Sequence, residues 1–171
     1  MPRWDAEVAA AVAYWQPRRG VSIDPALVHA IIEKETRHGA LPLTVLEPDG
    51  DRSFGPMSVK GATARTVLGI HDPATLIDPG RGIMAGVDYL ARKLKQYPGQ
   101  VDSAIAAYNA GTARRRSSGA FINQPYVVDV LGFWNAFKRT ARAAAPALLS
   151  AFLIAAAVWW LARRRRVAFS R

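Results

Sequence analysis

Residues 22–39 read SIDPALVHAIIEKETRHG, and this stretch predicts a helix that carries one carboxyl on an otherwise apolar face. Asp24 is a favoured N-cap residue, Pro25 suits the first helical position, and Gly39 is a common stop signal, so we expect a helix of about four turns. Apolar residues recur at the three- and four-residue spacings of a buried face: Leu27, Val28, Ile31 and Ile32.

Glu35 follows Ile31 by one helical turn on this face, whereas Glu33 points away from it. Apolar surroundings disfavour the charged form of a carboxyl, so the pKa of Glu35 should rise toward neutrality. Such a group can donate a proton to a leaving group at neutral pH. Taken alone, the helix also fits a structural Glu that is bonded to a backbone group or an arginine.

Four further motifs follow in order. They are SFGPMSV (53–59), ATAR (62–65), LIDPGRGIMAGVDYL (76–90) and AAYNAG (106–111). Together with Glu35-Thr36, they resemble the lytic transglycosylase family, relatives of goose-type lysozyme, over about residues 21–137. The resemblance implies a mainly α, lysozyme-like domain. It also implies cleavage of the β-1,4 bond between N-acetylmuramic acid and N-acetylglucosamine in peptidoglycan, with Glu35 as the single catalytic acid.

The resemblance further implies a set of residues that line the cleft and orient Glu35 and the sugar: Ser53, Met57, Tyr108, Asn109 and Tyr126. Structural alternatives exist. Ser53 would cap a loop, Met57 and Tyr126 would fill the core, and Asn109 would mark a helix end before Gly111. For Tyr108 and Asn109 the functional interpretation is favoured, because the whole AYNAG run surrounds them.

The chain departs from the family pattern at three places. Ser58 stands where the family usually has Gln, Thr36 replaces Ser but keeps the hydroxyl, and residues 123–127 (NQPYV) match only at their last two positions. The lost Gln leaves open a catalytically dead, membrane-anchored wall-binding module. The retained Glu35 argues against that alternative.

The reaction outcome is a further choice. The resemblance implies a 1,6-anhydro product, whereas goose-type lysozymes hydrolyse, which requires a second carboxylate to activate water. We expect Asp49 and Asp51 to be the only carboxylates of the cleft loop (residues 40–61) that could serve. Both lie in a PDGD turn, where Asp favours local backbone bonding. We therefore expect the 1,6-anhydro product, with a hydrolytic lysozyme as the alternative.

Composition and charge limit the number of domains, the metals and the partners that we expect for this chain. The 171 residues are 50% hydrophobic, which suits one globular domain, expected over residues 1–140. No cysteine is present, and the three histidines show no metal spacing, so we expect surface or loop histidines, no metal and no cofactor.

The net charge of +10 is concentrated in residues 114–116 and 163–166, and without a recognition motif it predicts no nucleic-acid partner. The oligomeric state stays unknown.

Helical periodicity predicts further helices over residues 4–16, 82–97, 101–109 and 125–137, and residues 40–61 predict a loop with a short hairpin. The arginine triplet 114–116 falls in a loop beside the expected cleft. It either attracts the anionic polymers of a cell wall or is simply a solvated loop.

Residues 143–162, AAAPALLSAFLIAAAVWWLA, are uncharged and match the ~20 residues that span a ~30 Å hydrocarbon core. They predict one transmembrane helix, with tryptophans 159 and 160 at its interface and the basic tail 163–171 on the cytoplasmic side. A buried core helix is the alternative interpretation.

The predicted location is a single-pass membrane protein whose enzyme domain faces the cell wall. No secretory signal precedes the domain, so an anchor at the other end of the chain would leave it inside the cell. Two settings resolve this conflict: a bacteriophage protein, in the membrane of a virion or in lysis, and a bacterial envelope enzyme exported by its own anchor. The phage setting is the one we favour.

Overall fold

Helix α2 (Pro25–Thr36) begins where the sequence predicts, because the Asp24 carboxylate accepts a hydrogen bond from the Ala26 amide at 2.8 Å. It ends earlier than predicted. Arg37 adopts a left-handed backbone with φ of 46°, and a 3-10 turn, η1 (Arg37–Gly39), follows. Gly39 therefore closes this turn rather than the helix. The predicted apolar face is buried in full.

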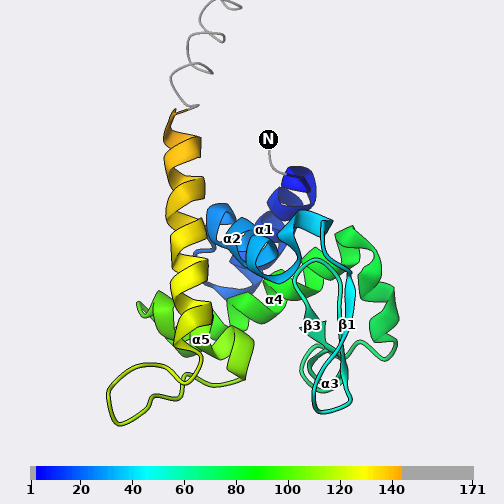
Figure 1. Ribbon diagram of the computed structural model, residues 1–171. Coiled ribbons are helices and arrows are strands. Elements are labelled where there is room, and N and C mark those ends of the chain that lie inside the picture. Colours follow the sequence, from blue (N-terminus) through cyan, green and yellow to red (C-terminus); the bar gives the residue numbers. More distant parts are fainter. Residues whose placement is uncertain (1–2, 144–171) are drawn as a thin grey trace, which may run out of the picture. The chain divides into compact units, whose positions relative to one another are not determined.

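Residues 3–143 are described by the computed structural model, and they confirm a mainly α-helical fold with one small sheet (Figure 1). Helix α4 (Pro79–Gln96) packs against α1 (Asp5–Arg19), α5 (Val101–Ala110) and the 3-10 helix η2 (Pro73–Ile77). In Figure 1 the sheet lies near the beginning of α4 and α5 near its end. This arrangement makes α4 the element that joins the two sides of the fold.

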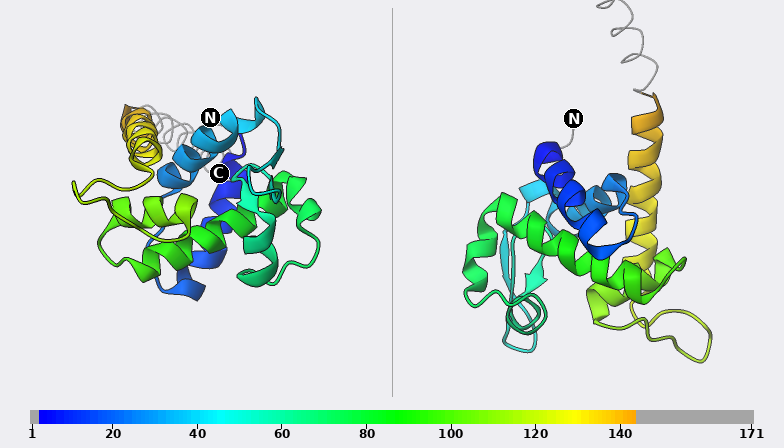
Figure 2. Two further views of the ribbon diagram at one scale, coloured as in Figure 1. Left: turned by 60° about the horizontal axis from the view of Figure 1, so that its bottom comes forward. Right: turned by 180° about the vertical axis from the view of Figure 1, so that it is seen from behind.

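Helix α1 packs on α4, as the right-hand view of Figure 2 shows. Val8, Ala11 and Val12 are buried, as expected for an amphipathic helix that packs on its own domain. The Trp15 indole donates to the Met84 carbonyl at 2.8 Å, which ties the far end of the helix to α4. The helix ends at Arg19, three residues beyond the predicted end at residue 16.

The segment predicted as a loop with a hairpin forms a three-stranded antiparallel sheet, β1 (Thr44–Leu46), β2 (Arg52–Phe54) and β3 (Val59–Lys60), in the order β1-β2-β3. Ser53 lies opposite Val45 on one side and opposite Lys60 on the other. Helix α3 (Gly61–Thr66) follows β3 directly.

Glycines allow the turn after β2 to lie directly on neighbouring backbone. Gly55 has φ of +79°, and a Cβ built there would lie 2.2 Å from the Leu76 carbonyl oxygen. A Cβ on Gly86 of α4 would lie 2.4 Å from the Met57 sulfur. The turn over residues 55–58 is therefore held at a separation that larger residues would not permit.

A chain of polar contacts joins the beginning of α1 to α2. Asp5 contacts Nε2 of His29 at 2.9 Å, Nδ1 of His29 lies 3.1 Å from Nε2 of His38, and Nδ1 of His38 contacts Glu33 at 2.8 Å. His29 is only 6% exposed. The expectation of surface or loop histidines is therefore wrong for His29, because tertiary packing places this helix face under α1. His71 is exposed, as expected.

The predicted last helix is also present, and the chain is helical from residue 124 to residue 143. Val127 and Val130 are buried, and the Trp134 indole donates to Asp24 at 2.7 Å. Within the described residues, the chain divides after Asn135 into two units. In the second unit, the Thr140 hydroxyl donates to the Ala136 carbonyl one turn earlier.

Among residues 3–143, no helix is both long and apolar enough to cross a membrane. The predicted transmembrane segment, residues 143–162, lies outside the described residues except for its first position, and the basic tail lies wholly outside them. The predicted anchor therefore stays a prediction.

Candidate active site

Glu35 lies in the last turn of α2, with its carboxyl withdrawn from solvent beside a polar cavity of about 360 Å³. Burial raises the pKa of this carboxyl to about 7, although hydrogen bonds from the Tyr126 and Ser58 hydroxyls and the nearby Lys34 ammonium lower it. A carboxyl with this pKa can hold a proton near neutral pH and release it to an oxygen in the cavity.

Tyr126 reaches Glu35 from the helix that begins at residue 124, and its hydroxyl donates to Glu35 Oε1 at 2.7 Å. Burial raises the pKa of Tyr126 well above its usual value, so the hydroxyl remains a donor. This contact joins residues 91 positions apart, and it fixes one carboxyl oxygen of Glu35.

Two hydroxyl groups hold the turn over residues 55–58 next to Glu35. The Thr36 hydroxyl donates to the Pro56 carbonyl at 2.9 Å, and the Tyr108 hydroxyl donates to the Met57 carbonyl at the same distance. The side chain of Met57 is fully buried. Contrary to the prediction, Met57 does not line the cavity. It fills the core under the turn, which matches its structural alternative.

Ser58 is the residue of this turn that contacts the Glu35 carboxyl. It has φ of 47°, a left-handed backbone that side chains seldom adopt, and its hydroxyl bonds to Glu35. The position that departs from the family's Gln therefore still supplies a hydrogen bond to the acid.

Tyr108 and Asn109 come from the last turns of α5 and both line the cavity. Tyr108 is buried, with its ring centroid 5.2 Å from that of Tyr89, whereas Asn109 is exposed. Asn123 donates from Nδ2 to Asn109 Oδ1 at 2.8 Å and to the Ala106 carbonyl at 3.0 Å. Asn123, which does not match the family pattern, thus holds Asn109 in place.

Ser53 lines the cavity and bonds to Glu47, a residue that no sequence motif singles out. Its hydroxyl donates to the carboxylate of Glu47, which lies in the turn between β1 and β2 and lines the same cavity as Glu35. The assumption that Asp49 and Asp51 are the only carboxylates of the cleft loop is therefore wrong. The spacing of β1 and β2 around the turn was the signal that could have placed Glu47.

Asp49 and Asp51 have local structural roles. Asp49 pairs with Lys60, and Asp51 accepts hydrogen bonds from the Ala62 amide at 2.8 Å and from Arg65 at 3.4 Å. These bonds lower the pKa of both carboxyls. Neither residue lines the cavity at Glu35.

The arginine loop turns back on itself. Arg115 donates to the Gly119 carbonyl at 2.8 Å and lies 3.7 Å from the centroid of the Phe121 ring, and Arg116 donates to the Ile122 carbonyl. None of the three arginines lines the cavity at Glu35. Attraction of anionic wall polymers by this loop stays a prediction.

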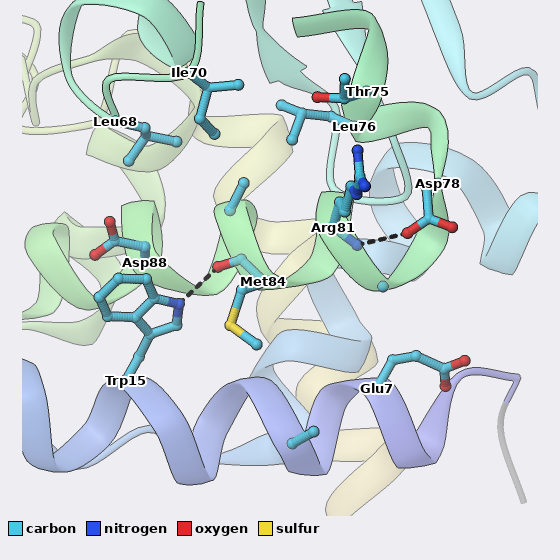
Figure 3. A pocket seen from close by; sticks show the side chains of 13 residues that line it. Glu7, Trp15, Leu68, Ile70, Thr75, Leu76, Asp78, Arg81, Met84 and Asp88 are labelled. Atoms are coloured by element: carbon cyan, nitrogen blue, oxygen red, sulfur yellow. Dashed lines mark hydrogen bonds between the residues drawn. The ribbon is translucent and has the colours of Figure 1, made fainter. Parts of the chain in front are cut away.

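A larger groove of about 640 Å³ lies between α1, α4 and the segment that leads into η2 (Figure 3). Its lining is mostly apolar. Two of its acids are occupied: Asp88 pairs with Arg19 and Arg92, and Asp78 accepts a hydrogen bond from the Arg81 amide. The smaller polar cavity holds Glu35, the carboxyl whose pKa burial raises to about 7, and it is therefore the candidate active site.

A mainly helical domain that holds one desolvated carboxyl in a polar cleft is suited to acid-catalysed cleavage of a glycan. Residues 13–121 match the family model described as Transglycosylase SLT domain, so the chain belongs to this family. Membership indicates a peptidoglycan lytic transglycosylase-like function. The matched range contains Glu35 and every predicted site residue except Tyr126.

Proposed function

We propose that this protein is a peptidoglycan lytic transglycosylase that cleaves the β-1,4 bond between N-acetylmuramic acid and N-acetylglucosamine with Glu35 as acid and then base. The observation that carries the proposal is the Glu35 carboxyl beside the polar cavity, with a pKa raised by burial to about 7. Clearing of a peptidoglycan gel by the full chain in detergent tests it directly.

In the proposed reaction, Glu35 first protonates the glycosidic oxygen and the bond to the anomeric carbon breaks. The acetamido oxygen of muramic acid bonds to that carbon. Glu35, now a carboxylate, takes the proton of the C6 hydroxyl, whose oxygen displaces the acetamido oxygen. The product ends in 1,6-anhydromuramic acid and no water is consumed.

Product analysis distinguishes this reaction from hydrolysis. We expect fragments that are one water lighter than reducing-end sugars by mass spectrometry. Asp49→Asn and Asp51→Asn should both retain most activity, because these side chains bond to Lys60 and to the start of α3 rather than face the cavity. Mainly reducing-end products would make the protein a hydrolytic lysozyme. In that alternative, Glu47 is the carboxylate of the cavity that would activate water.

We also propose that residues 143–162 anchor the enzyme in a membrane. The membrane would belong either to a bacteriophage setting, as part of a virion or in lysis, or to the bacterial envelope. The proposal is supported by the length and apolarity of that run and by the arginines that follow it.

Truncation tests the anchor. The chain ending at Arg142 should be soluble and active, because the apolar run adds membrane affinity rather than core, while the intact chain should require detergent. Sedimentation with and without detergent, together with circular dichroism, measures both properties. An unfolded truncated chain beside a full chain that stays in solution without detergent would contradict the anchor.

A further inference from the structure

Glu47 faces the same cavity as Glu35 and has one carboxylate oxygen to spare. The Ser53 hydroxyl donates to Oε1, while no hydrogen bond reaches Oε2 from any residue within 3–143. An unshared carboxylate oxygen at the wall of a sugar cleft is a strong acceptor for a donor on the substrate.

The turn keeps Glu47 in a fixed position. Its amide donates to the Asp51 carbonyl at 2.8 Å, and its carbonyl accepts from the Gly50 amide at 3.0 Å. Ser53, which holds its carboxylate, is 5% exposed and lies on the middle strand of the sheet. Glu47 is therefore preorganised, and little ordering is required when a substrate enters.

The two carboxyl groups of the cavity differ in charge. Glu35 is desolvated and holds its proton near neutral pH, whereas Glu47 acts on Glu35 as a negative charge. Lys60, on the same wall, is held by Asp49. The cavity thus pairs a proton donor with a carboxylate that has a free acceptor position, which is the division of roles that glycan cleavage uses.

A substrate-assisted cleavage creates one donor that needs such an acceptor. When the acetamido oxygen bonds to the anomeric carbon, positive charge develops on the acetamido group and its N–H becomes a stronger donor. A fixed carboxylate placed to accept that N–H stabilises the charge as it forms.

Building on the proposed function, we propose that Glu47, held by Ser53, accepts the hydrogen bond of the muramic acetamido N–H and so orients and stabilises the group that assists Glu35. The N–H bond does not break. When the C6 oxygen displaces the acetamido oxygen, the positive charge disappears and the hydrogen bond weakens again.

The test compares Glu47→Gln with Asp49→Asn in the full chain. Both changes remove one negative charge from the same turn, but only Glu47 lines the cavity. Two quantities are measured: kcat on purified sacculi, and the affinity for a muramyl thiazoline, a stable mimic of the cyclised acetamido intermediate. Glu47→Gln should lower kcat by roughly 100-fold or more and thiazoline affinity by about tenfold.

Asp49→Asn should change both quantities by less than about twofold, because it removes an exposed ion pair. Ser53→Ala should shift both in the same direction as Glu47→Gln, because it releases the carboxylate. The alkaline limb of the pH profile should also move to lower pH in Glu47→Gln, since the negative charge of Glu47 raises the pKa of Glu35.

Unchanged thiazoline affinity in Glu47→Gln would overturn the inference, and so would loss of a hydrolytic product with thiazoline binding intact, since Glu47 would then activate water. Failure of the wild type to clear peptidoglycan would instead contradict the proposed function. Thiazoline binding is measured without turnover, so it tests Glu47 even in that case.

Discussion

Glu35→Gln should lower peptidoglycan cleavage by roughly 100-fold or more while the protein remains folded, because the amide keeps the shape of the carboxyl but has no proton to donate. Clearing of purified sacculi, followed by turbidity, measures the loss. In the wild type, kcat/KM should fall as the pH rises above about 7, since the raised pKa of Glu35 keeps the acid protonated only below that value.

The matched control is Glu33→Gln on the same helix. Glu33 contacts His38 and is not part of the cavity lining, so this change should leave cleavage nearly intact. Equal damage from both substitutions would show that the orientation of the helix relative to the cavity is wrong.

Gly55→Ala should reduce the free energy of unfolding by about 3 kcal/mol or more, as the sum of left-handed backbone strain and overpacking. Its φ is +79°, and the new Cβ would lie 2.2 Å from the Leu76 carbonyl oxygen, a backbone atom that cannot rotate away. Urea unfolding followed by circular dichroism measures the change.

Gly50→Ala separates the two causes. Gly50 has φ of +83°, but a Cβ there meets nothing within 4 Å, so this variant should lose only about 1 kcal/mol of backbone strain. If the two variants lost the same stability, the close approach of residue 55 to the Leu76 carbonyl would have no energetic weight.

Local signals predicted the helix that carries the acid well. The cap at Asp24, the proline after it and the apolar spacing lie within one segment, and the structure reproduces each of them. The end of that helix was placed incorrectly, because Arg37 adopts a left-handed conformation that no residue type there signals.

The cavity residues that come from the turns of the sheet were harder to predict. Glu47 reaches the cavity through the pairing of β1 with β2, and Ser58 reaches Glu35 through its own left-handed backbone. Neither position stands out as a motif. The Tyr126 contact was implied only by the family resemblance, since the sequence alone does not show that residues 91 positions apart will meet.

The chain of histidine contacts that begins at α1 determines how many protons the two rings must hold. Each ring nitrogen of His29 and His38 has a partner: Asp5 and Glu33 require an N–H at the two outer nitrogens, and the contact between the rings requires one proton between them. With hydrogens placed to satisfy all three contacts, the two rings hold three protons and share one imidazolium charge.

A fourth proton would set two N–H groups against each other at the 3.1 Å contact, and loss of the third would leave two lone pairs facing there. Either change would therefore break the hydrogen bond between the two rings. One shared proton thus joins the helix of Glu35 to the turn that follows it, while the N–H at the other nitrogen of His29 attaches the first helix.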